Sequence, residues 1–399
     1  MNSKLIALAL FLLTAASVVL YPPKQGVGAI RPSPKPTAAP NTTQHARIDV
    51  AFVLDTTGSM GGLLQAAKEK IWSIATSMSQ AKPTPRIRMG LVAYRDRGDE
   101  YVTKVVDLTA DLDSMYAQLM DFSAAGGGDT PESVNQALAD AVNKMSWSSN
   151  NNAYKVVFLV GDAPPHMDYP QDTPYADTLK LATRMGITIN AIQCGQAPST
   201  RQTWQHIART GGGEFFNVNR SGSAVAVATP FDRKLADLSA KLDATRLYYG
   251  DAEDKAKQAH KLAATEKLRR ESSIPSRARR ATFNATASGK NNFLGEGELV
   301  DAVSSGRVAL SSIAPKDLPE SIQALAPAEQ AAVVEEKTEQ RKNLQRQINE
   351  TAQKRSDYLR AKIGALGGAR DSLDEKLYRT VRKQAGKKDI LLEADKPDY

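Results

Sequence analysis

Oxygen-bearing side chains occur at three places in the sequence where they could bind a metal ion. The residues are Asp55, Thr57 and Ser59 directly after an apolar run, Asp129 and Thr130 in a glycine-rich loop, and Asp162 after a second apolar run. The glycines at 126–128 allow the loop backbone to approach a ligand closely. Carboxylates and hydroxyls, without imidazole or thiol, suit a hard divalent cation such as Mg²⁺ or Mn²⁺. The sequence therefore predicts an all-oxygen metal site that an acidic group of a partner could complete.

The elements that must position these residues follow from the apolar pattern. Residues 48–54 and 156–160 form almost unbroken apolar runs, which are typical of central parallel strands covered on both faces. Helical spacing follows the first run, and strand-like and helix-like segments alternate up to residue 220. This alternation predicts an α/β fold with a doubly wound, mostly parallel sheet. In such sheets ligands bind at the carboxyl ends of the strands, where Asp55 and Asp162 stand.

Aspartate is also common in turns and at helix N-caps, so either of these residues alone would specify little. Together, Asp55-x-Thr57-x-Ser59, the Asp129-Thr130 loop and Asp162 resemble the metal-ion-dependent adhesion site of the von Willebrand factor type A domain. The resemblance covers residues 47–220. It departs from the usual pattern at Thr57, where Ser is typical, but a hydroxyl is kept.

The resemblance implies a role for each of these residues. It implies that Thr57, Ser59 and Thr130 offer hydroxyl ligands. It also implies that the carboxylates of Asp55 and Asp162 act directly or through water. Asp129 is the alternative to Thr130, and it is expected with His166 at the rim of the site. For His166 a local hydrogen bond within its own loop is the alternative. The implied function is binding of a protein partner without catalysis.

An exported hydrolase is the main alternative function. Residues 57–61, Thr-Gly-Ser-Met-Gly, differ at one position from the G-x-S-x-G nucleophile elbow, with Ser59 as its nucleophile. However, Thr57 stands where the elbow has Gly, and only one predicted strand precedes Ser59. A phosphotransferase with an aspartyl nucleophile would normally have a second Asp two residues after Asp55, where Thr57 stands instead. The sequence also has no phosphate-binding loop of the type G-x-x-x-x-G-K-[ST]. A structural subunit of an envelope assembly is a third hypothesis.

Composition and the N-terminal segment bound the compartment and the partners. The single cysteine excludes a disulfide within the chain and a cysteine-based zinc cluster. A net charge of +8 on 399 residues is weak evidence for nucleic-acid binding, and we expect none. Lys4 and the apolar run 5–20 predict a signal peptide or signal-anchor within 1–29. A proline-rich linker follows at 30–46. We expect an exported protein, periplasmic or extracellular, which an uncleaved segment would attach to the membrane.

The second half of the sequence shows no cluster of ligand-type residues. Residues 231–366 are predicted to be mainly helical, with a long helix that starts at Pro327 and packs on its own domain rather than forming a coiled coil. Residues 367–399 are expected to be a polar tail. Residues 47–220 are expected to fold alone and to bind the partner without 221–399; the alternative is that the helix from Phe231 packs across the sheet edge and is needed.

Overall fold

The computed structural model describes residues 46–128, 130–219, 228–365 and 373–392. The expected signal segment 1–29, nearly all of the linker 30–46, and Asp129 lie outside these residues. Among the helices within the described ranges, none has both the length and the apolar content needed to cross a membrane.

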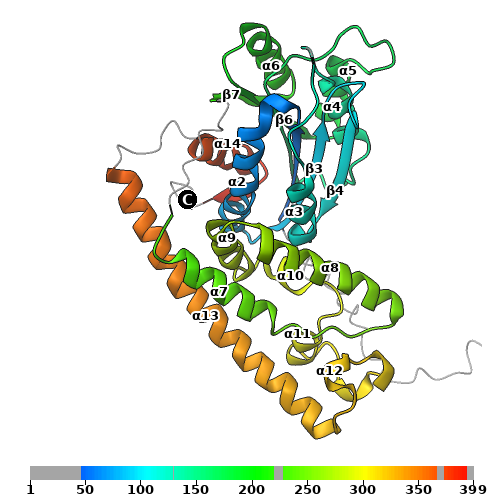
Figure 1. Cartoon of the computed structure of the whole chain (residues 1–399), viewed down its shortest axis with the longest axis vertical. Coiled ribbons are helices and arrows are strands. Elements are labelled where there is room, and N and C mark those ends of the chain that lie inside the picture. The colour runs from blue at the N-terminus through cyan, green and yellow to red at the C-terminus, as the bar shows by residue number, and fades with distance from the viewer. Residues whose placement is uncertain (1–45, 129, 220–227, 366–372, 393–399) are drawn as a thin grey trace, which may run out of the picture. The chain divides into compact units, whose positions relative to one another are not determined.

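A six-stranded sheet in the order β4-β3-β1-β5-β6-β7 forms the centre of the first half of the chain (Figure 1). Its strands are β1 (Arg47–Asp55), β3 (Arg86–Tyr94), β4 (Thr103–Thr109), β5 (Tyr154–Gly161), β6 (Ile187–Cys194) and β7 (Gly212–Val218). All neighbours are parallel except β3 and β4, which are antiparallel. The predicted mostly parallel α/β sheet is therefore confirmed.

Helices cover both faces of this sheet. One face carries α2 (Gly61–Ser79) and α3 (Leu112–Asp121), and the other carries α4 (Val134–Asn143), α5 (Tyr175–Arg184) and α6 (Pro198–Thr210). Successive side chains of β1 point to opposite faces, so Phe52 belongs to the first core and Val53 to the second. Burial of one such apolar side chain contributes roughly 1.5–3 kcal/mol. This two-sided burial explains why the strand sequences are continuously apolar.

The second half of the chain is helical, as predicted. It comprises α7 (Asp232–Asp243), α8 (Ala252–Glu271), α9 (Ile274–Asn284), α10 (Lys290–Leu294), α11 (Leu299–Ser304), α12 (Glu320–Gln323) and α13 (Pro327–Ala365). Helix α13 begins at the predicted proline and packs on α7 and α11. Arg355 interrupts its apolar stripe but is buried in an ion pair with Asp232, at an N–O distance of 2.7 Å. A buried charge of this kind needs such a partner.

Helices α8 and α9 continue the core of the sheet region. Phe283 of α9 packs against Trp72 of α2, with ring centroids 5.8 Å apart. The Tyr116 hydroxyl of α3 lies 2.9 Å from the Ser276 hydroxyl. Leu268 of α8 belongs to the same buried cluster. This packing argues against the expectation that 47–220 folds alone, because α2 and α3 would expose these apolar surfaces without the second half.

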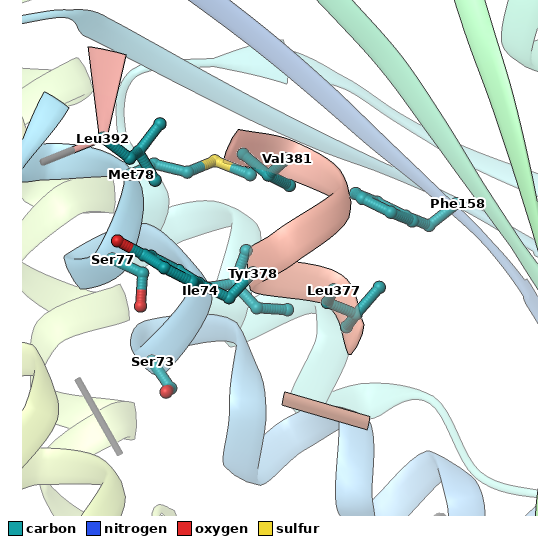
Figure 2. A pocket seen from close by; sticks show the side chains of 9 residues that line it. All are labelled: Ser73, Ile74, Ser77, Met78, Phe158, Leu377, Tyr378, Val381 and Leu392. Carbon is teal, nitrogen blue, oxygen red and sulfur yellow. The ribbon is translucent and has the colours of Figure 1, made fainter. Parts of the chain in front are cut away.

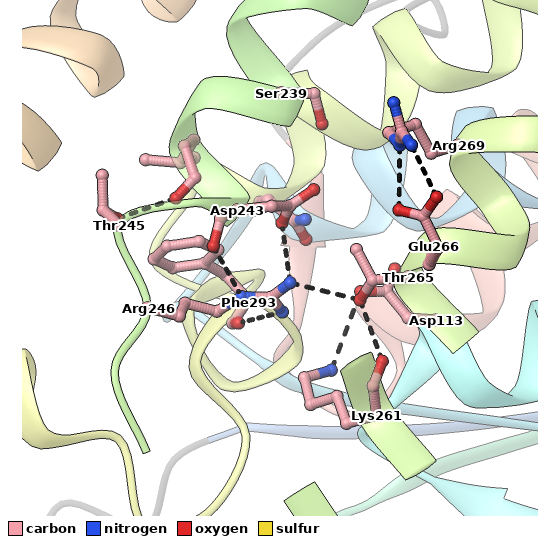
Figure 3. Close-up of polar contacts among 12 residues, drawn as sticks. Asp113, Ser239, Asp243, Thr245, Arg246, Lys261, Thr265, Glu266, Arg269 and Phe293 are labelled. Atoms are coloured by element: carbon pink, nitrogen blue, oxygen red, sulfur yellow. Dashed lines mark hydrogen bonds and ion pairs between the residues drawn. The ribbon is translucent and has the colours of Figure 1, made fainter. Parts of the chain in front are cut away.

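A buried ion network joins the two halves at the same place. The Arg280 guanidinium donates to both Asp113 carboxylate oxygens at 2.6 Å and to Asp243 Oδ2 at 2.7 Å. Figure 3 shows Asp113, Asp243 and Lys261 converging between α3, α7 and α8. Burial alone would raise the pKa of Asp113, but Arg280 and Lys261 hold that pKa well below its ordinary value. The charges are therefore mutually compensated.

The expectation of a polar tail at 367–399 is wrong for part of that range. Residues Leu373–Gly386 form helix α14, and β8 (Leu391–Leu392) pairs antiparallel with β2 (Ala81–Lys82). Figure 2 shows Leu377, Tyr378 and Val381 directed toward α2 and the sheet, where they line a pocket with Phe158. The many Lys and Arg residues between these positions hide an apolar stripe of helical spacing. Helix α14 thus covers part of one face of the sheet.

Candidate metal site

The turn after β1 brings three of the predicted site residues together. The Thr57 backbone N–H donates to Asp55 Oδ1 at 2.9 Å, and the Thr57 hydroxyl donates to the same oxygen at 2.6 Å. The Ser59 hydroxyl lies 3.4 Å from the Thr57 hydroxyl, in a single 3₁₀ turn (Gly58–Met60) that precedes α2. One carboxylate and two hydroxyls therefore meet at the carboxyl end of the central strand.

The second oxygen of Asp55 has no hydrogen-bond partner within the described part of the chain. Asp55 is only 2% exposed, and its Oδ2 atom is buried. Gly161, the last residue of β5, lies beside it, since a Cβ atom at position 161 would come within 3.0 Å of Asp55 Oδ2. Asp162 follows immediately, and its negative charge acts on Asp55. The structure thus brings Asp162 to the same strand ends as Asp55, Thr57 and Ser59.

Glu132 adds a further carboxylate that sequence reasoning did not single out. It is 4% exposed, and its Oε2 atom is buried without a hydrogen-bond partner among the described residues. Its backbone N–H donates to Pro164 O at 2.9 Å, and its carbonyl accepts from the His166 N–H at 2.9 Å. A Cβ atom on Gly127 would lie 3.1 Å from Thr57 Cβ and 3.4 Å from Glu132 Oε1. Glu132 is thus held near Thr57 under the glycine loop.

These carboxylates repel one another in a buried setting. Burial raises the pKa of Asp55 to about 7, with Asp162 adding to the rise and the hydrogen bonds from Thr57 opposing it. Burial also raises the pKa of Glu132 to about 9, together with the charges of Asp55, Asp96 and Asp99. A cation at this place would relieve both the burial cost and the repulsion. The donor set, carboxylates and hydroxyls only, fits Mg²⁺ or Mn²⁺.

The remaining predicted residues belong to the loop before α4. Thr130 is exposed in the same loop, joined by a cis bond to Pro131. Asp129 lies outside the described residues, so its role as an alternative ligand stays a prediction. Within the described ranges, no three carboxylate, imidazole or thiol groups are arranged to bind a metal together. A metal at this site would therefore depend on the hydroxyls as well as on the carboxylates.

His166 makes the local contacts that were its alternative role. Its Nδ1 atom lies 2.8 Å from Asp168 Oδ1, and its ring stacks on Tyr169 with centroids 4.1 Å apart. Its Nε2 atom lies 3.3 Å from Asp96 Oδ2. Asp96 also accepts from the Ser133 hydroxyl at 2.8 Å. His166 therefore connects the loop after β5 to the loops before β4 and α4. Its backbone N–H, which donates to the Glu132 carbonyl, fixes the position of Glu132.

Arg95 supports the turn from the other side and was also missed by sequence reasoning. Its guanidinium donates to Thr56 O at 3.2 Å and to Ser123 O at 2.9 Å, and it lies over the Tyr101 ring at 4.4 Å. The Thr56 hydroxyl donates to Tyr94 O at 2.8 Å. An Arg directly after an apolar strand gives no sequence signal for this role, because the carbonyls to which it donates, those of Thr56 and Ser123, are distant in the chain.

The raised pKa of Asp55 leads to a prediction for the protein without a cation. Its ordinary pKa is 3.8, and its pKa in the folded protein is about 7. Between these values the folded protein holds a proton that the unfolded chain has released. The contribution of Asp55 to the free energy of unfolding therefore falls by on the order of 4 kcal/mol as pH rises from about 4 to about 7, and this contribution levels off above that.

Thermal unfolding in a chelator at about pH 5 and about pH 8 tests this prediction. We expect a lower Tm at the higher pH, and recovery of that loss when Mg²⁺ is added. Asp55→Asn is the matched control, since it cannot titrate and should show a smaller change in Tm. An equal pH response in Asp55→Asn and in the unaltered protein would contradict the assignment to Asp55.

Comparison with known proteins shows which family the residues around this site resemble. A family model described as von Willebrand factor A domain matches residues 49–220. Two curated relatives are the von Willebrand factor A domain-containing protein 7 of Rattus norvegicus, 39% identical over 116 residues, and that of Homo sapiens, 38% identical over 116 residues. Each alignment covers 29% of this chain and only 12% of the relative's length.

Solved structures of low sequence identity are also similar over part of the chain. The von Willebrand factor type A protein from Catenulispora acidiphila has a TM-score of 0.33 and 20% identity, and it covers 44% of this chain and 39% of its own. The VWA domain of SpRpn10 has a TM-score of 0.33 and 16% identity, and it covers 44% of this chain and 89% of its own.

The sheet order, the site at the strand ends and the family match together define the class of this protein. It is a von Willebrand factor A domain protein, with the domain in residues 49–220 and a helical region after it. Domains of this class are protein-interaction modules.

Proposed function

We propose that this protein is an exported binding module that uses a divalent cation to engage an acidic group of a protein partner. Asp55, Thr57, Ser59, Thr130 and Asp162 would hold Mg²⁺ or Mn²⁺. The observation that carries this proposal is Asp55 Oδ2, a buried carboxylate oxygen without a hydrogen-bond partner among the described residues. A buried charge of this kind is costly unless a cation or a proton compensates it.

The charge balance supports an anionic partner group. Asp55 and Asp162 together neutralise a divalent cation, and the hydroxyls add no charge. Open positions around a cation of this kind are filled by water, which a partner's carboxylate can replace.

Ser59 offers little support for the hydrolase alternative. Its hydroxyl contacts the Thr57 hydroxyl, and no described histidine or lysine lies within hydrogen-bond distance of it. A serine nucleophile needs a neighbouring base to lose its proton. A chromogenic activated ester tests the hydrolase alternative directly. If Ser59 were a nucleophile, its acylation would release the chromophore, and the Ser59→Ala variant would release none.

A pull-down from the native envelope fraction tests the proposed function, because the predicted signal segment 1–29 would direct the protein to that compartment. We expect a partner protein to be retained in Mg²⁺ and released by a chelator, since the cation carries the contact. A soluble carboxylate-rich peptide should compete for retention, whereas an amidated form of the same peptide should not. Retention that is equal with and without chelator would contradict a cation-dependent contact.

A further inference from the structure

The edge strand β7 lies beside helix α14 (Figure 1), and a groove with a cationic wall runs along this edge. Its volume is about 750 Å³, and its lining residues are Glu214 and Phe216 of β7 with Lys376, Arg379, Thr380, Arg382 and Lys383 of α14. Four cationic side chains thus line the groove with one carboxylate. Arg382 is engaged in an interaction of its own, so the excess charge is that of Lys376 and Arg379. Glu214 already accepts from the Thr380 hydroxyl at 2.9 Å and from Lys383 Nζ at 2.8 Å. The groove therefore carries an excess of positive charge that an anionic ligand would balance.

The strand that borders this groove presents unpaired backbone groups. β7 stands last in the strand order, and within the described ranges it pairs only with β6. The Val218 carbonyl accepts from Gly195 N–H at 2.9 Å, so Val218 faces β6. The backbone N–H and C=O groups of successive residues in a parallel strand point to alternate sides. Those of Phe215 and Asn217 therefore point away from β6, toward the open edge. Such an edge can pair with one more strand.

The side chains of β7 define what that strand would meet. Phe216 belongs to the core on the α14 side of the sheet, and Phe215 packs on the core of the α6 side. In an added strand every second side chain would lie on the α14 side, over the groove. Those positions would stand beside Lys376 and Arg379, whereas the alternate positions would continue the apolar surface of Phe215.

We propose that β7 and α14 bind an extended segment of a partner protein whose acidic residues fall at every second position. The backbone of the segment pairs with the outer edge of β7, and its carboxylates contact Lys376 and Arg379. This contact lies outside the turn that holds Asp55 and needs no divalent cation. An edge strand favours a peptide over an anionic membrane or a nucleic acid, because only a peptide backbone can satisfy its N–H and C=O groups.

Fluorescence anisotropy of the full chain with a labelled peptide tests this proposal. The probe is an alternating Val-Glu peptide as long as β7, measured in a chelator. We expect saturable binding that weakens as ionic strength rises toward about 0.15 M. The double variant Lys376→Glu/Arg379→Glu should weaken binding by about tenfold or more, since rim charges across an interface both attract and select. The matched control Lys337→Glu/Arg346→Glu reverses two charges on α13 and should change binding by less than about twofold.

The peptide itself supplies a test that leaves the protein unaltered. N-methylation at alternate residues removes the N–H groups that would pair with β7 and keeps every charge, so binding should be lost. The same residues rearranged with all glutamates in one half should bind more weakly than the alternating peptide. Equal binding of the N-methylated peptide would overturn the strand pairing. Binding of phosphatidylglycerol vesicles without binding of the peptide would overturn the choice of partner.

Discussion

Asp55→Ala should lower the affinity for Mg²⁺ or Mn²⁺ by at least about 100-fold, because changes in outer-shell residues alone cost 10–100-fold. Asp55 provides the carboxylate that organises the turn, since both Thr57 hydrogen bonds end on its Oδ1 atom. Its free Oδ2 atom is the buried oxygen that a cation would compensate. Titration calorimetry with Mn²⁺ above pH 7, where the Asp55 carboxylate is charged, measures the difference.

The fold should survive this substitution. Burial raises the pKa of Asp55 to about 7, so its ionised form does not stabilise the folded chain, and its removal relieves repulsion with Asp162. Asp168→Asn is the control, because it removes one negative charge from a side chain that is 74% exposed on the neighbouring loop. We expect its cation affinity to stay within about threefold of the unaltered protein. Equal cation affinity in Asp55→Ala and the unaltered protein would refute the site.

Arg280→Met should destabilise the folded protein by about 3–5 kcal/mol. The methionine keeps much of the side-chain volume but leaves Asp113 and Asp243 without their shared guanidinium partner. Asp113 is fully buried, and a buried carboxylate that loses its cation bears the full cost of desolvation. Urea unfolding followed by circular dichroism measures the change in the free energy of unfolding.

Two further variants isolate the cause. Arg269→Met removes an exposed guanidinium that pairs with Glu266, and we expect a change within about 0.5 kcal/mol. Adding Asp113→Asn to Arg280→Met removes the uncompensated charge, so the double variant should recover part of the lost stability. A loss no larger in Arg280→Met than in Arg269→Met would show that the network does not hold the helical region to the domain.

Local sequence patterns predicted what depends on neighbours in the chain. The continuous apolar runs predicted β1 and β5, and Pro327 predicted the start of α13, because each signal lies within its own element. Asp55, Thr57 and Ser59 fall in a single turn, so their spacing placed them together. Asp162 could be added because the carboxyl ends of parallel strands share one edge of the sheet.

The features that sequence reasoning missed depend on contacts between distant segments. Glu132 faces the site because its backbone pairs with Pro164 and His166 in another loop. Arg280 has its partners at Asp113 and Asp243, which no local pattern links to it. The apolar side of α14 is interleaved with basic residues, and its role appears only when Gln384 accepts from the Tyr154 hydroxyl at 2.7 Å. Long-range partners of this kind leave no periodic trace.

The position of α14 and β8 also fixes when the domain can complete its folding. Leu377, Tyr378 and Val381 share one buried cluster with strand residues near position 50, and β8 pairs with residues 81–82. During synthesis the part of this face that α14 and β8 cover therefore stays open until residue 392, more than three hundred residues after β2, has left the ribosome. A nascent chain in that state exposes aggregation-prone surface. The time that this face needs protection is thus set by the length of the helical region between β7 and α14.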